Sequence, residues 1–196
     1  MKWRLARLRD DSEIKVNKIF GIGLSRTGTT SLYYLMKDFG FTAVHYPSSM
    51  EDIDEHFFCN DTSVSSRFEA LDRLYPNSKF IYTTRAVHHW APSCVKHFII
   101  PRRLELIRSM PRKLKAWYDY ADSNLYDRDQ LALANVTEEE LVMAYRRHDQ
   151  RVRSYFKERP ADLLIIDITD KSTQPLSKLM AFLEPLGLVG IPSSKA

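Results

Sequence analysis

Residues 18–32 read KIFGIGLSRTGTTSL, and this stretch decides the fold of the chain. A short apolar run, residues 19–22, leads into a loop that contains Gly23 and Gly28, and apolar residues at helical spacing follow from Leu32 to Phe39. This order predicts a strand, a glycine loop and the N-terminus of a helix. The first N–H groups of a helix have no partner within it, and the helix dipole adds partial positive charge. The loop therefore suits a phosphate or sulfate group.

The loop has the G-x-x-x-x-G spacing of a Walker A motif but lacks the lysine of that motif. Thr29 stands in the place of the lysine, and the cation of the loop is Arg26. An enzyme that hydrolyses a triphosphate loses its main electrostatic clamp by this change, whereas a protein that binds a smaller anionic group can place a cation beside it. A glycine-rich turn that binds no ligand is the alternative.

A second segment, residues 79–98 (KFIYTTRAVHHWAPSCVKHF), has the same order of strand and helix. The β-branched and aromatic residues of positions 79–84 predict a strand that ends at Arg85, and Ser93 follows eight residues later. A guanidinium binds phosphate in a bidentate fork, and a hydroxyl adds a further donor. The pair predicts a phosphate site, although an arginine taken alone is more often an ordinary surface residue.

These two segments resemble the sulfotransferases that use 3′-phosphoadenosine 5′-phosphosulfate (PAPS). Arg26-Thr27-Gly28-Thr29-Thr30 lines up with the family's loop of the type Lys-Ser-Gly-Thr-Thr, with arginine in the lysine place. The resemblance covers about residues 18–187, and it implies transfer of a sulfuryl group from PAPS to a hydroxyl or amine of a small-molecule or glycan acceptor. The donor-binding residues that it implies are Ser25, Arg26, Thr27, Gly28, Thr29, Thr30, Ser31, Arg85 and Ser93.

The resemblance leaves two candidates for the catalytic base. Asp61, in Asp61-Thr62-Ser63-Val64, falls with an offset of two residues in the place of the family's histidine, and other branches of the family use a carboxylate. His45 ends an expected strand. We expect Asp61 to be the base in preference to His45, and Arg26 to stabilise the leaving phosphate oxygen. Asp61 is equally suited to cap the helix that follows it, and His45 to a structural role.

Strands alternate with helices along the chain, which predicts the α/β class with a mostly parallel sheet flanked by helices, in a P-loop nucleoside-kinase-like sulfotransferase architecture. Ligands of such sheets bind beyond the C-terminal ends of the strands, where Arg26, Asp61 and Arg85 stand. We expect residues 97–135 to form the acceptor side and a lid. The expected strands are residues 18–23, 42–45, 58–61, 79–84 and 162–168, and the expected helices are 29–39, 66–74, 90–99, 137–156 and 175–186.

Composition narrows the class of protein. The 196 residues suit one domain, residues 1–196, and 44% hydrophobic with 28% charged residues is typical of a soluble globular chain. The net charge of +4 is concentrated in residues 101–117, which predicts a solvated helical face or an electrostatic collar for anions; no nucleic-acid motif accompanies it. Because no long apolar run and no signal core are present, we expect a cytoplasmic protein without a membrane span.

Cys59 and Cys94 do not form a metal-type pair, so we expect free thiols and no metal. Two further functions stay open. A P-loop kinase for small molecules is disfavoured by the missing lysine. A non-catalytic nucleotide-binding relative fits the uncertain base and the lack, before Ala196, of the Arg-Lys-Gly loop that completes the 3′-phosphate site in cytosolic relatives.

Overall fold

The computed structural model describes residues 17–186, and it confirms the expected α/β class. Five strands form one sheet in the order β2-β3-β1-β4-β5, and every neighbouring pair is parallel. The central strand, β1, pairs Ile19 with Phe58 on one side and with Lys79 on the other. The strands are β1 (Ile19–Gly21), β2 (Ala43–His45), β3 (Phe58–Asn60), β4 (Lys79–Thr83) and β5 (Leu163–Ile166).

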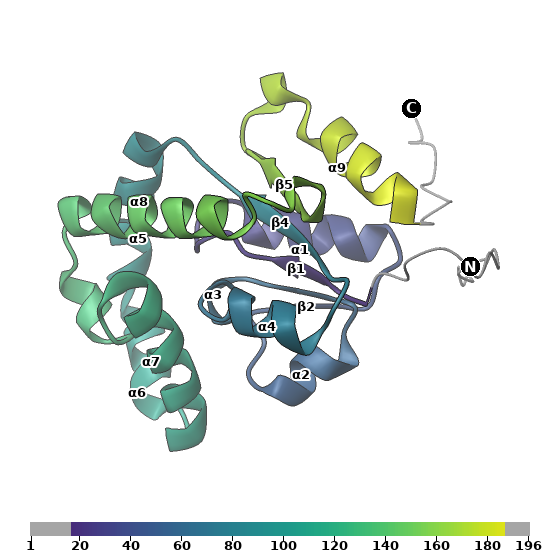
Figure 1. Ribbon diagram of the computed structural model, residues 1–196. Helices are drawn as coiled ribbons and strands as arrows, with labels where there is room; N and C mark the ends of the chain where they lie inside the picture. The colour runs from purple at the N-terminus through teal and green to yellow at the C-terminus, as the bar shows by residue number, and fades with distance from the viewer. Residues whose placement is uncertain (1–16, 187–196) are drawn as a thin grey trace.

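Helices cover both faces of this sheet (Figure 1). They are α1 (Thr29–Asp38), α2 (Met50–Glu55), α3 (Thr62–Ser65), α4 (Phe68–Leu74), α5 (Val87–Phe98), α6 (Pro101–Ser109), α7 (Arg112–Tyr126), α8 (Glu138–Tyr155) and α9 (Pro175–Leu183). Short 3₁₀ turns lie at Ala132–Asn135, Pro160–Asp162, Lys171–Thr173 and Glu184–Leu186.

The order of the strands places the loops that follow β1, β3 and β4 side by side. The chain builds β2 and β3 on one side of β1 and then crosses to the other side to form β4 and β5. Ligands of doubly wound sheets bind at such a crossing point, beyond the carboxyl ends of the strands. The glycine loop, Asp61 and Arg85 therefore converge at one edge of the sheet.

Alternate residues of the central strands point to opposite faces, as the twofold period of a strand requires. Ile19 and Ile81 pack with α1 and α9, whereas Phe20, Phe80 and Tyr82 pack with α4 and α8. A third cluster joins α5, α7 and α8 around Trp90 and Tyr126 and includes Leu24 of the glycine loop. These helices, on the left of Figure 1, are thus anchored to the loop that carries the candidate site.

Two helix ends carry well-known capping motifs. Thr137 and Glu140 form a capping box at the start of α8. Gly40, at φ 89°, ends α1: its N–H donates to the Lys37 carbonyl, and the next N–H donates to the carbonyl of Met36. This pair of bonds is the Schellman pattern, in which a glycine takes the left-handed conformation.

The expected starts of two helices were wrong. Helix α5 begins at Val87 rather than at residue 90, because the N–H groups of His89 and Trp90 both donate to the carbonyl of Ala86. The helix expected at 66–74 is α4, which begins at Phe68, because Arg67 leaves the helical region at φ −120° and ψ 8°; the short helix α3 precedes it as a separate element. In the region expected to form the acceptor side and lid, residues 97–135, helix α7 runs to Tyr126, and Asp127 then turns left-handed at φ 58°.

Within residues 17–186, no helix is both long and apolar enough to cross a membrane. The same residues hold no cluster of three or more His, Cys, Asp or Glu side chains arranged to bind a metal. Cys59 and Cys94 are free and buried. The expectations for the N-terminal signal region and for the segment after Gly187 lie outside the described residues.

Candidate active site

The glycine loop requires glycine at two positions. A Cβ atom at Gly23 would lie 1.9 Å from Thr83 Oγ1 and 2.8 Å from the Thr83 carbonyl, so only glycine lets the loop pass the end of β4. Gly28 is the N-cap of α1 at φ 98°, a conformation that other residues rarely adopt. The loop therefore reaches α1 with its backbone close to β4.

Some hydroxyl groups of the loop are buried, and others are exposed. The Thr27 hydroxyl is buried: it donates to the Leu24 carbonyl at 2.7 Å and lies 2.8 Å from Thr83 Oγ1, so it shapes the loop. Thr30 and Ser31 are exposed at the start of α1. The exposed hydroxyls and the unpaired N–H groups of the first helical turn are thus the donors that an anion can reach.

A cationic cleft of about 370 Å³ opens beside the loop. Arg26, held at φ 71°, donates from Nε to the hydroxyl of Ser93 on α5 at 3.2 Å, and Arg85 donates to the Arg26 carbonyl at 3.3 Å. The structure thus brings Arg26, the cation of the glycine loop, together with Arg85 and Ser93, the pair in which the sequence predicts a phosphate site. The cleft is lined by Arg26, Arg85, His89, Pro92, Ser93, Lys96, His97 and Ile100.

Sequence reasoning missed three polar residues of this cleft, His89, Lys96 and His97. They share one face of α5 with Ser93, and their spacing of three and four residues is the signal that could have found them. No carboxylate lines the cleft. Burial, together with the charges of Arg103 and Arg26, lowers the pKa of His97, so at neutral pH the fixed positive charge comes from Arg26, Arg85 and Lys96.

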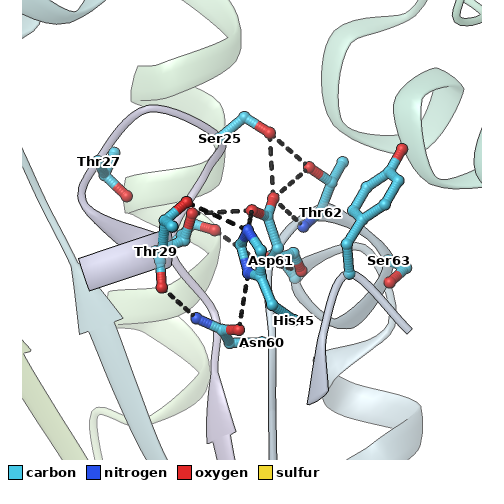
Figure 2. A network of polar contacts seen from close by, with 12 residues as sticks. Ser25, Thr27, Thr29, His45, Asn60, Asp61, Thr62 and Ser63 are labelled. Atoms are coloured by element: carbon cyan, nitrogen blue, oxygen red, sulfur yellow. Dashed lines mark hydrogen bonds and ion pairs between the residues drawn. The ribbon is translucent and has the colours of Figure 1, made fainter. Parts of the chain in front are cut away.

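Asp61 belongs to a second part of the site, the polar network shown in Figure 2. The carboxylate is nearly buried and accepts hydrogen bonds from the Ser25 hydroxyl (3.0 Å), the Thr29 hydroxyl (2.8 Å), and both the N–H and the hydroxyl of Thr62 (2.6 and 2.7 Å). The bond from the Thr62 N–H caps α3, which confirms the capping role considered for Asp61. Two donors of the glycine loop therefore fix this carboxylate.

The backbone of Asp61 is strained, with φ 87° and ψ −172°. This region is almost confined to glycine and costs about 1–3 kcal/mol for other residues. Such strain persists where the surroundings over-determine a conformation, and it clusters at functional sites. Here the four hydrogen bonds to the carboxylate hold the conformation.

His45 faces this carboxylate from the end of β2. Its Nε2 lies 3.3 Å from Asp61 Oδ2 and 3.2 Å from the Thr30 hydroxyl. Asn60 donates from its amide nitrogen to the Thr29 carbonyl at 2.7 Å, so its amide oxygen must accept from His45 Nδ1, 3.0 Å away. We assign the ring proton of neutral His45 to Nδ1 on this ground, which leaves Nε2 free to accept a proton.

The cationic cleft and the polar network around Asp61 are joined through neighbouring residues of the glycine loop. Ser25 contacts Asp61, and Arg26 contacts Ser93. The arrangement can bind an anion in the cationic cleft and place a proton acceptor near the end of that anion that lies farthest from the cleft. Transfer of an anionic group to a protic acceptor needs both of these features.

A known protein family matches most of the described part of the chain. A family model described as a sulfotransferase domain matches residues 53–186, more than half of the chain. The matched segment contains Asp61, Arg85 and Ser93, whereas the glycine loop and His45 precede it. No curated protein matches the chain. The chain therefore belongs to the sulfotransferase-domain family, with the sulfotransferase-type function of that domain and a P-loop-like α/β fold.

Proposed function

We propose that the protein transfers the sulfuryl group of PAPS to a hydroxyl or amine of a small acceptor. The cationic cleft carries the proposal, because Arg26 Nε of the glycine loop lies 3.2 Å from the hydroxyl of Ser93, so one nucleotide can reach both the loop and the cleft. Arg85 and Lys96 line the same cleft, and no carboxylate opposes them. These residues fit the 3′-phosphate that distinguishes PAPS from ATP.

The loop residues take different parts in binding the donor. Arg85, Ser93 and Lys96 bind the 3′-phosphate, and the first turn of α1 binds the phosphosulfate through its N–H groups, that of Thr30 included, and through the hydroxyl of Ser31. Thr27 and Gly28 act through the shape of the loop. Ser25 and Thr29 act through Asp61, to which their hydroxyls donate.

When bound, PAPS supplies an activated sulfuryl group: the acceptor oxygen or nitrogen bonds to sulfur while the bond from sulfur to the 5′-phosphate oxygen breaks and its electron pair stays on that oxygen. Arg26 and the N–H groups of the loop stabilise the charge that develops there. The acceptor proton must pass to a base of the protein.

The Asp61–His45 pair is the base that we propose. In the neutral ring, Nε2 accepts from the Thr30 hydroxyl at 3.2 Å; after it takes a proton, it donates to Asp61 Oδ2 at 3.3 Å. Asp61 thus stabilises the proton whichever of the two groups receives it first, and Asn60 keeps the ring in place.

A transfer assay tests the proposal. PAPS labelled in its sulfuryl group is incubated with the protein and a panel of hydroxyl and amine acceptors, and label is measured in the acceptor. We expect transfer by the wild-type protein and its loss in Asp61→Asn. Transfer that persists in Arg85→Ala at low PAPS concentration, as in the surface control Arg108→Ala, would contradict the assigned donor site.

A further inference from the structure

Helix α7 and the turn after it carry buried polar atoms that no other described residue satisfies. They are Asp122 Oδ2, Tyr126 Oη and Gln130 Oε1, on side chains that are 3%, 4% and 2% exposed. Nearly all buried polar atoms in proteins have a hydrogen-bond partner, so three such atoms within nine residues need an explanation.

These atoms lie close to the candidate active site. Gln130 donates from Nε2 to the hydroxyl of Tyr46, at 3.0 Å, and Tyr46 directly follows His45. Burial raises the pKa of Asp122 to about 7; the charge of Arg103 and the side chain of Gln130 oppose this rise, and the charge of Asp61 adds to it. The orphan groups therefore lie within electrostatic reach of the proposed base.

Tyr126 has both Asp122 and Asp61 among the charged groups that act on its hydroxyl. Burial and the neighbouring Cys94, Asp122 and Asp61 raise the pKa of its hydroxyl, and the Ser25 hydroxyl opposes that rise. Ser25 itself donates to Asp61. The orphan atoms and the proposed base thus share neighbouring polar groups.

The orphan atoms have a common chemistry. Asp122 Oδ2 and Gln130 Oε1 can only accept in the ionised and amide forms, and the tyrosine hydroxyl can accept as well. In the described part of the chain, no basic side chain forms an ion pair with Asp122. The nearby Arg103 donates instead to the carbonyls of Phe98 and Gln130. The group that complements the cluster is a cation with several N–H donors.

We propose that Asp122, Tyr126 and Gln130 bind an ammonium group of the acceptor, so that the substrate is an amine that also carries the hydroxyl to be sulfated. The inference rests on the proposed function. An ammonium supplies three donors, and the cluster offers three acceptors. The charge of the ammonium also compensates the buried carboxylate, which is costly to leave unpaired.

The test uses matched probes that differ only in the amine: tyramine against 4-ethylphenol, and 5-aminopentan-1-ol against pentan-1-ol. Binding to the full chain is measured by calorimetry at pH 8 in the presence of adenosine 3′,5′-bisphosphate. We expect at least one amine to bind about tenfold more tightly than its partner, because hydrogen bonds to charged groups are the strong ones. Asp122→Asn should abolish this preference.

Asp127→Asn is the matched control. It removes the same charge from the end of the same helix, at a left-handed position that asparagine tolerates, and its side chain is 73% exposed. The preference for the amine should persist in this variant. Gln130→Met is a second variant that removes an acceptor and keeps the volume, and it should reduce the preference several-fold.

Two results would overturn the inference: equal binding of both members of each pair to the wild-type protein, or a preference that survives in Asp122→Asn. The orphan atoms are then satisfied by buried water. Binding of adenosine 3′,5′-bisphosphate, measured first, tests the proposed function separately. If this nucleotide binds and no amine is preferred, only the inference fails; if the nucleotide does not bind, the proposed function fails and the inference with it.

Discussion

The buried carboxyl of Asp122 makes the stability of the free protein depend on pH, and Asp122→Asn should remove that dependence. Burial raises the pKa of this group from 3.8 to about 7 in the folded protein. The folded state therefore binds the proton more tightly than the unfolded chain, whose carboxyl ionises near its ordinary pKa. Stability falls as the pH rises from about 4 to about 7, and the full cost is present above pH 7.

The magnitude follows from the size of the shift. Each pKa unit corresponds to about 1.4 kcal/mol, so a rise of about three units costs about 4 kcal/mol once the group is ionised. Asparagine has the same shape and does not ionise. The variant should match the wild-type protein near pH 4 and exceed its free energy of unfolding by about 4 kcal/mol at pH 8.

Urea denaturation of both proteins at several pH values between 4 and 8 measures this difference, and groups unaffected by the substitution cancel in it. Asp127→Asn, on the exposed end of the same helix, should show no such trend. A difference that does not change with pH, or a variant that is less stable at pH 8, would refute the reasoning, because Asp122 would then be well solvated or paired in the folded state.

Three further predictions concern other parts of the molecule. Burial lowers the pKa of His148 to about 4, so the free energy of unfolding of the wild-type protein should fall by about 3 kcal/mol as the pH falls from about 6.5 to 4. The variant His148→Gln can still donate to the Ile22 carbonyl, and urea titrations of this variant should not show the fall. Arg26→Ala should lower kcat by about 10²–10³-fold and change nucleotide affinity less, and an unchanged kcat argues against its role. Asp61→Asn and His45→Gln should each abolish most transfer, with a double variant no slower than either; additive losses in kcat would show that the two groups act independently.

The strands, the glycine loop and the cationic cleft were predictable because their signals are local. Apolar residues at positions 19–22 mark a buried strand, and the glycines follow at once. The distance between Arg85 and Ser93 is set by a strand end and one helix, so the sequence spacing places them together.

The contact between His45 and Asp61 could not be predicted from local signals in this way. His45 and Asp61 meet because β2 and β3 are neighbours in register, which pairs His45 with Asn60. That pairing depends on the whole sheet. For the same reason the sequence did not show that the Thr27 hydroxyl turns inward to Thr83.

Helix α7 shows most clearly what could not be predicted from the sequence. Its start belongs to the basic segment that the sequence indicates as a solvated face, yet Asp122 and Tyr126 are buried on its other face. Which face of a helix is buried against its neighbours, here α3 and α8, depends on packing between distant parts of the chain. Polar residues on that face gave no signal of burial.

Nucleotide choice tests the central claim most directly. The melting temperature is measured with adenosine 3′,5′-bisphosphate and with ATP, with and without Mg²⁺, for the wild-type protein, Arg85→Ala and the control Arg108→Ala. The bisphosphate at 100 times its dissociation constant should stabilise the wild-type protein and the control by about 2.7 kcal/mol, without need of Mg²⁺, and should stabilise Arg85→Ala far less. Equal stabilisation by ATP, or a requirement for Mg²⁺, would contradict a PAPS-dependent sulfotransferase and favour a kinase.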